Sequence, residues 1–252
     1  MRGLEAREVT VRFGGTTALD RTSITVEPGR VTGLIGPNGA GKTTLFNVVC
    51  GLLAAQRGRV LLDDADITTA PPHRRARLGL ARTFQRLELF TSLTVRDNVR
   101  VAGDIRRRWA QFRRESDGGG GGAGDEAERI IELTGLGAIA DREVSEIPTG
   151  QARVVELARA LMTRPSVLLL DEPAAGQTEA ETEAFGRLLR RLADDGLAVC
   201  LVEHDMSLVM EVCETVHVLD YGRTIAVGSP DEVRHDAAVV EAYLGTPEGV
   251  GP

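Results

Sequence analysis

The chain has 252 residues, of which 42% are hydrophobic and 27% are charged, a composition typical of one large globular domain or two coupled subdomains. Its formal net charge of −7 argues against a protein that binds nucleic acid through a general basic field. No apolar run is long enough to cross a bilayer and the N-terminus has no signal-peptide core, so we expect a soluble, cytoplasmic chain that reaches a membrane only through a partner.

The first third of the chain alternates short strands with turns. Strands are predicted at 9–13, 23–27, 31–35 and 60–64, and a helix with prolines at its start at 71–80. The strand at 31–35 runs directly into the segment GPNGAGKT, and a helix follows from Lys42 to Cys50. This succession of strand, glycine-rich turn and helix is the setting in which proteins bind phosphate groups.

The segment GPNGAGKT, residues 36–43, fits the phosphate-binding pattern G-x-x-x-x-G-K-[ST] in full. Its glycines allow backbone N–H groups to surround phosphate oxygens, Lys42 can reach the terminal phosphates and the Thr43 hydroxyl can ligate Mg²⁺. Lys42 is also the only lysine of the chain, which fits a position that needs a compact point charge rather than a guanidinium. The pattern favours nucleotide binding over a chance glycine-rich loop.

From residue 86 to residue 155 the pattern is mainly helical, and we expect a helical insertion there. The glycine-rich segment 117–125 interrupts it and is predicted to be a flexible surface loop, either a tolerated insertion or a hinge. An amphipathic helix is predicted from Gln151 onward, with Arg153, Glu156 and Arg159 as its polar positions. The tight entry Pro148-Thr149-Gly150 leaves backbone N–H groups free for an anion.

Strands and helices alternate again from Ser166 onward, which predicts a mostly parallel α/β core with helices on both faces. Ligands bind at the carboxyl ends of parallel strands, and one apolar strand ends there in Asp171 and Glu172. Asp171 can hold Mg²⁺ and Glu172 can polarise an attacking water, although an acidic pair capping a helix is a structural alternative. His204 ends another apolar strand, a position where a lone histidine is more often structural than catalytic.

In this order, these motifs resemble the nucleotide-binding subunit of ATP-binding cassette (ABC) transporters over essentially the whole chain. The resemblance implies an α/β fold with a P-loop NTPase (RecA-like) core of mostly parallel sheet, an N-terminal antiparallel β subdomain and a helical insertion subdomain. We expect the core and β subdomain at 1–85 and 156–252, and the helical subdomain, with the signature motif, at 86–155.

The resemblance also assigns the site, which would bind ATP and Mg²⁺. Phe13 would stack on adenine, and the phosphates would be bound by Gly36, Pro37, Asn38, Gly39, Ala40, Gly41, Lys42, Thr43 and Thr44. Catalysis would depend on Lys42, Gln85 of the Q-loop, Glu172 and the switch residue His204. The metal ligands would be Thr43, Gln85 and Asp171.

The family signature, usually LSGGQ, contacts the ATP of a partner cassette, and here it departs from the pattern. Pro148 stands at the serine position and offers neither hydroxyl nor N–H, Thr149 replaces a glycine, and Gly150 and Gln151 remain. After EPAAG the D-loop has Gln177-Thr178, where the family usually has a leucine and then an acid or amide. Because both departures act in trans, we expect a heterodimer with a different second cassette; the alternative is a neutral change, with Thr149 lending its hydroxyl.

The segments RTFQRLELFTSLTVRDNV, VEHDMSLVMEVCETVHVLDYG and VVEAYLG resemble the branched-chain amino-acid branch of the family. They imply an ATPase at the inner face of the cell membrane that powers import through two membrane-spanning permease subunits, with a solute-binding protein as an indirect partner. The segment RLELF, 86–90, would receive a short helix of a membrane subunit. Importers of urea and short amides, a lipopolysaccharide exporter, a non-transport cassette ATPase and a regulatory module that no longer hydrolyses ATP remain alternatives.

Overall fold

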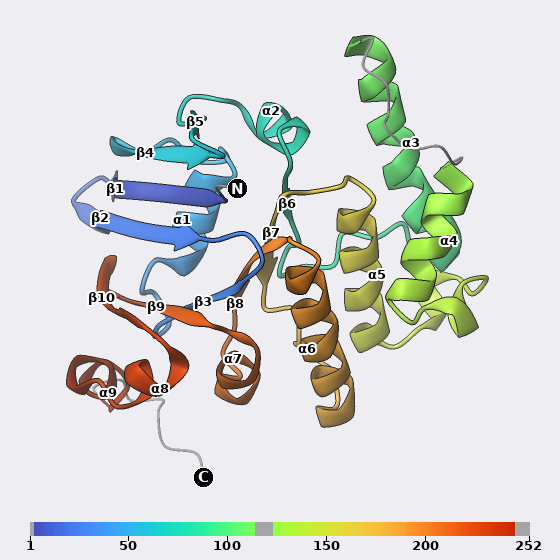
Figure 1. The fold of residues 1–252 in the computed structure, drawn as a ribbon. Coiled ribbons are helices and arrows are strands. Elements are labelled where there is room, and N and C mark those ends of the chain that lie inside the picture. The colour runs from blue at the N-terminus through green and yellow to red at the C-terminus, as the bar shows by residue number, and fades with distance from the viewer. Residues whose placement is uncertain (1–2, 114–122, 245–252) are drawn as a thin grey trace.

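The computed structural model describes residues 3–113 and 123–244, which form two sheets and the helices around them (Figure 1). The smaller sheet is antiparallel, with the strand order β2-β1-β4-β5. Its strands are β1 (Leu4–Phe13), β2 (Thr16–Val26), β4 (Arg57–Leu62) and β5 (Ala65–Asp66). This sheet confirms the expected N-terminal antiparallel β subdomain.

The larger sheet has the strand order β10-β9-β3-β8-β7-β6 and is parallel except for the final hairpin of β9 and β10. Its strands are β3 (Val31–Ile35), β6 (Leu80–Arg82), β7 (Val167–Asp171), β8 (Ala198–Val202), β9 (Thr215–Asp220) and β10 (Arg223–Gly228). The predicted mostly parallel P-loop NTPase core is therefore confirmed. Parallel pairing of β3, β7 and β8 brings the carboxyl ends of these strands to one edge of the sheet.

Helices surround the larger sheet, and α3, α4 and α5 stand together on the side away from the smaller sheet (Figure 1). The helices are α1 (Lys42–Val49), α2 (Pro72–Arg77), α3 (Val95–Arg113), α4 (Ala123–Leu133), α5 (Thr149–Leu161), α6 (Glu179–Asp194), α7 (Met206–Val212), α8 (Pro230–Arg234) and α9 (Ala237–Leu244). The group of α3, α4 and α5 is the expected helical insertion, and the exact subdomain limits stay predictions.

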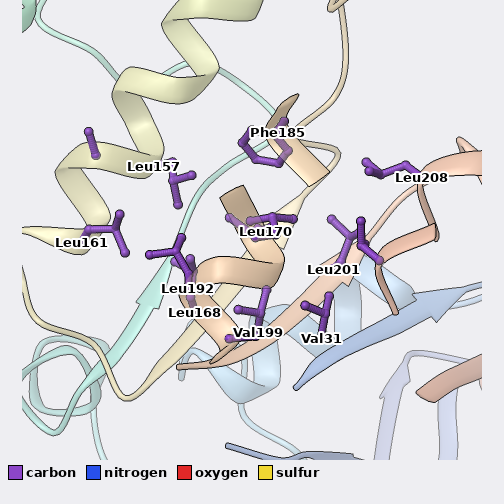
Figure 2. Packing of buried hydrophobic residues seen from close by; sticks show 14 of the residues in the cluster. Val31, Leu157, Leu161, Leu168, Leu170, Phe185, Leu192, Val199, Leu201 and Leu208 are labelled. Atoms are coloured by element: carbon purple, nitrogen blue, oxygen red, sulfur yellow. The ribbon is translucent and has the colours of Figure 1, made fainter. Parts of the chain in front are cut away.

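The two faces of strand β7 belong to two different apolar clusters, as the alternation of side chains along a strand requires. Leu168 and Leu170 pack with Leu157 and Leu161 of α5 and with Phe185 of α6 (Figure 2). The alternate side chains of β7 pack instead with α1 and the smaller sheet. Because both faces are dry, the strand is held rigidly and its last residue, the predicted metal ligand, is fixed in place.

Some predicted boundaries were wrong at the points where backbone conformation overrides the side-chain pattern. The helix predicted over 71–80 ends at Arg77, since Gly79 (φ 102°) turns the chain and Leu80 starts β6. The signature helix begins at Thr149, two residues before its predicted start. Of the predicted glycine-rich loop 117–125, the last three residues are the first of helix α4, and the others lie outside the described residues.

Candidate nucleotide site

The glycine-rich segment between β3 and α1 has a backbone that only glycine can supply at two points. Gly36 (φ 148°) lies so close to the larger sheet that a Cβ atom would sit 2.0 Å from the carbonyl oxygen of Leu219. A Cβ on Gly41 (φ 108°) would sit 2.8 Å from the carbonyl oxygen of Ala18 in β2. The segment is therefore pressed between the two sheets, with its geometry set before any ligand arrives.

Lys42 is buried at the start of helix α1 and directs its ammonium group back into the loop. Its Nζ atom donates to the carbonyl oxygens of Gly36 at 2.6 Å and Pro37 at 3.1 Å. Burial lowers the pKa of Lys42, while the nearby carboxylates of Glu172 and Asp171 act in the opposite direction. A compact cation held only by carbonyl oxygens can transfer to phosphate oxygens, which are stronger acceptors.

Asp171 ends strand β7 with its carboxylate buried against Arg82 of β6. The Nη2 atom of Arg82 lies 2.9 Å from Oδ2 of Asp171, and its Nη1 donates to Oδ1 of Asn47 on α1 at 2.7 Å. The guanidinium also lies 5.4 Å and 5.0 Å from the ring centres of Phe46 and Phe84. The role of Arg82 was not predicted from the sequence, although an arginine in a strand beside an apolar strand was a signal for a buried ion pair.

Glu172, Gln85 and His204 come from three separate loops and meet at one point. Gln85 donates through Nε2 to Oε2 of Glu172 at 3.0 Å, and Nε2 of His204 lies 2.9 Å from Oε1 of Glu172. Glu172 has a positive φ of 49°, a conformation that costs a non-glycine residue free energy and that clusters at functional sites. The structure thus brings these three predicted catalytic residues together.

The residues predicted to hold Mg²⁺ offer only oxygen donors, which is the set this ion prefers. Thr43 is exposed on the first turn of α1, Asp171 ends the neighbouring strand β7, and Gln85 follows β6. Among residues 3–113 and 123–244, no group of three or more His, Cys, Asp or Glu side chains forms a metal cage. The residues therefore fit an ion that is held jointly with nucleotide phosphates rather than by the protein alone.

Phe13 lies at the end of β1 with 53% of its surface exposed. Its neighbour β2 passes beside Gly41 of the phosphate-binding loop through the carbonyl of Ala18. An exposed ring on the sheet that flanks the loop is suited to stack on a flat base. The remaining predicted residues Asn38, Gly39 and Ala40 lie between β3 and α1, and Thr44 lies in the first turn of α1. The carbonyl oxygen of Ala40 accepts a hydrogen bond from the N–H of Gly222 at 2.8 Å.

The signature helix α5 starts without a side-chain cap. Pro148 is the N-cap residue, with φ −58° and ψ 152°, and both it and Thr149 are exposed to solvent. Gly150 is buried in the first turn and Gln151 is half-buried. Exposed first-turn N–H groups at a helix N-terminus suit an anion that comes from outside the chain.

The signature and the D-loop, residues 174–178, touch each other within the chain. A Cβ atom on Gly150 would lie 3.1 Å from Cγ of Gln177, and one on Gly176 would lie 3.4 Å from Cγ2 of Thr149. The two motifs that depart from the family pattern are therefore in contact. Within the described part of the chain, the Oε1 atoms of Gln151 and Gln177 are buried without a hydrogen-bond partner.

Helix α5 is also hydrogen-bonded to the loop that carries Gln85, through two residues that were predicted as polar positions of the helix. Arg153 donates to the carbonyl oxygen of Phe84 at 2.8 Å and to that of Gln85, and it pairs with Glu156 at 3.0 Å. Glu156 in turn accepts the N–H of Glu88 at 2.8 Å. Arg153 and Glu156 are 8% and 6% exposed, so these two polar positions of the predicted amphipathic helix are buried rather than open to solvent.

Comparison with known proteins gives consistent matches. The family model for the ABC transporter matches residues 19–175, and that for the branched-chain amino acid ATP-binding cassette transporter matches residues 223–249. The chain is 37% identical to the high-affinity branched-chain amino acid transport ATP-binding protein BraF of Pseudomonas aeruginosa, over 96% of this chain and 97% of BraF. It is 36% identical to LivG of Escherichia coli, with the same coverage.

Two further matches concern export and structure. The chain is 34% identical to the lipopolysaccharide export system ATP-binding protein LptB of Escherichia coli, over 97% of this chain and 98% of LptB. A crystal structure of the ADP conformation of an ATP-binding cassette of an ABC transporter superposes with a TM-score of 0.85 and 33% identity, covering 98% of this chain and all of that one.

Proposed function

The chain belongs to the ABC transporter family of ATP-binding subunits, and we propose that it powers import of branched-chain or related amino acids. The observation that carries the proposal is the meeting of Gln85, Glu172 and His204 beside the phosphate-binding loop. The amino-acid substrate is supported by the identity to BraF and LivG and by the match of residues 223–249. ATP hydrolysis is the activity of the family.

We assign ATP binding and hydrolysis to the following residues of the site. Lys42 would exchange its loop carbonyls for the terminal phosphates of ATP, and the ring of Phe13 would stack on adenine. Bound Mg²⁺, held by Thr43, Gln85 and Asp171, would neutralise phosphate charge. Glu172 would orient and polarise the attacking water.

When ATP binds, His204 would exchange its contact with Glu172 for one with the γ-phosphate. In the structure, Nε2 of His204 lies 2.9 Å from Oε1 of Glu172, so each side chain takes up a hydrogen-bonding position of the other. A γ-phosphate would draw His204 towards itself, and the water would take its place beside Glu172. Hydrolysis would then begin only after the γ-phosphate of ATP has bound.

The membrane partners would be two permease subunits, which receive solute from a solute-binding protein. No helix of the described residues is long and apolar enough to cross a bilayer. The chain would attach at the inner face of the membrane through the permease subunits. Within the segment 86–90, Leu89 packs against the core, whereas Phe90 is 47% exposed and lies 5.1 Å below the guanidinium of Arg159. Phe90 is therefore the better contact for a helix of a membrane subunit.

The second cassette would be a different chain. The cis residues Lys42, Asp171 and Glu172 are intact, while Pro148 offers neither hydroxyl nor N–H to a nucleotide across the interface. A lost hydrogen bond to a charged phosphate costs about 1.5–3 kcal/mol. A homodimer would carry that loss at both sites, and a heterodimer at only one.

Uptake by reconstituted complexes tests the proposed function. The chain would be co-expressed with its membrane subunits and second cassette, placed in vesicles and supplied with a binding protein and labelled leucine. We expect ATP-dependent leucine uptake that Glu172→Gln abolishes. Uptake of urea instead would move the substrate to short amides, and ATP hydrolysis without co-purifying membrane subunits would contradict transport.

Lipopolysaccharide export is the second candidate, because the identity to LptB is nearly as high as that to LivG. The match of residues 223–249 to the branched-chain amino acid model favours import. Membrane subunits that release lipopolysaccharide from vesicles, with no uptake of amino acids, would reverse this preference.

A further inference from the structure

Glu203 is a buried carboxylate in the loop between β8 and α7, directly before His204, with 6% of its surface exposed. A buried carboxylate is costly unless hydrogen bonds stabilise it. Its Oε1 accepts the N–H of Ala174 at 2.8 Å and its Oε2 accepts the N–H of His204 at 3.0 Å. The N–H of Asp205 points to the same carboxylate. The described contacts of Glu203 are therefore with backbone groups of two functional loops.

The two loops carry different halves of the reaction. Glu172 donates its own N–H to the carbonyl of Val202 at 2.9 Å, so the turn after β7 already lies against the end of β8. Ala174 follows two residues later and opens the D-loop, which touches the signature through Gly176 and Thr149. His204 belongs to the other loop and pairs with Glu172. One carboxylate thus spans the gap between the switch histidine and the D-loop.

We propose that Glu203 is a positioning residue that joins the loop of His204 to the turn leading from Glu172 into the D-loop. It rests on the proposed function, in which His204 responds to the chain's own nucleotide and the D-loop faces the partner's. A displacement of His204 by γ-phosphate would be passed through the Glu203 carboxylate to Ala174. The two nucleotide sites of the dimer would be linked inside this chain.

Burial supports this role. It raises the pKa of Glu203, and the N–H groups of Ala174, His204 and Asp205 oppose that effect. The surrounding structure thus supplies hydrogen-bond donors to a carboxylate at a buried position that an apolar side chain could have filled. Glutamine at this position would keep the volume but turn one acceptor oxygen into an NH₂ donor, which cannot accept an N–H. The isosteric change therefore breaks the link on one side without opening a cavity.

The test compares parent, Glu203→Gln and Glu172→Gln chains, each in the complete transporter with the second cassette. We expect Glu203→Gln to lower kcat for ATP about tenfold, near the lower limit for a lost hydrogen bond to a charged group, with KM for ATP within about twofold. Glu172→Gln reports on the proposed function. If it leaves turnover intact, the site assignment fails, whereas full turnover in Glu203→Gln alone overturns only the role of Glu203.

Amide hydrogen exchange distinguishes a positioning role of Glu203 from a purely structural one. In the parent, ATP should protect the amides of both the phosphate-binding loop, 36–44, and the D-loop, 174–178. In Glu203→Gln, ATP should still protect 36–44 but no longer 174–178. Glu156→Gln is the matched control, because Glu156 is equally buried and also accepts a backbone N–H, but on the loop of Gln85. Faster exchange throughout β7 and β8 in Glu203→Gln, or the same D-loop change in Glu156→Gln, would overturn the proposal.

Discussion

Two regions of the molecule, the loops for the chain's own nucleotide and the surface for a partner's, differ in how their side chains are held. Lys42 is 7% and Asp171 is 4% exposed, and both have partners within the chain. At the start of α5, by contrast, Pro148 and Thr149 face solvent without a side-chain cap. The cis region is preorganised by the fold, whereas the proposed trans region has no such side-chain hydrogen bonds at Pro148 and Thr149 among the described residues and would be completed by another subunit. The departures from the family pattern, at Pro148 and Thr149, lie in the second region.

The largest expected effect comes from Glu172, the centre of the cis region. Glu172→Gln in this chain should lower ATP turnover of the assembled transporter by a factor of at least about 100, because a general base contributes between about 10² and 10⁴ in rate. The equivalent change in the second cassette should cost much less, since in the proposed heterodimer that cassette's ATP would face Pro148. Phosphate release from the two single variants measures both, with matched expression as the control. Equal losses would contradict the heterodimer.

Arg82 tests whether the cis region is preorganised by burial. Arg82→Met leaves the buried Asp171 carboxylate without its ion-pair partner, and removing one partner of a buried pair costs about 3–5 kcal/mol. We expect a fall of that size in the free energy of unfolding, measured by urea denaturation. Asn47→Ala is the matched control, because it removes only the acceptor for Nη1 of Arg82 and should cost about 1 kcal/mol. Similar losses in both variants would show that the ion pair is not what holds Asp171.

The site residues that could be predicted from the sequence are those that belong to motifs with a fixed spacing or order along the chain. The segment 36–43 has a fixed spacing, and Gln85, Glu172 and His204 were placed by the order of motifs along the chain. The buried contacts of Arg82, Arg153 and Glu203 were not predicted, because each is a buried charge with a partner that is far away in sequence or is a backbone group. Polarity along a helix or strand indicates exposure on average, and it fails where a charge is held by hydrogen bonds from another element.

Pro148 tests the trans region directly. In a Glu172→Gln background, which retains bound ATP, Pro148→Ser should strengthen ATP-dependent dimerisation by about 10- to 100-fold, because it restores a hydroxyl and an N–H that can reach the partner's phosphate. Sedimentation with and without ATP measures the dimer. Pro148→Ala is the control, since it restores the N–H alone and should recover only part of the gain. Tight dimerisation with proline in place would show that the helix N-terminus suffices.

The smallest effect concerns the contact between the signature and the D-loop. Thr149→Gly and Gln177→Leu each restore the usual family residue, and their positions adjoin through Gly176 and Gly150. Because neighbouring residues are coupled, the effects of the two changes on dimerisation should deviate from additivity by about 0.5–1 kcal/mol. Gln177→Leu combined with a change at exposed Val227 on β10 should be additive within about 0.3–0.5 kcal/mol. If the first pair is additive too, the two departures act independently, and the proposed trans surface is a set of separate contacts rather than one unit.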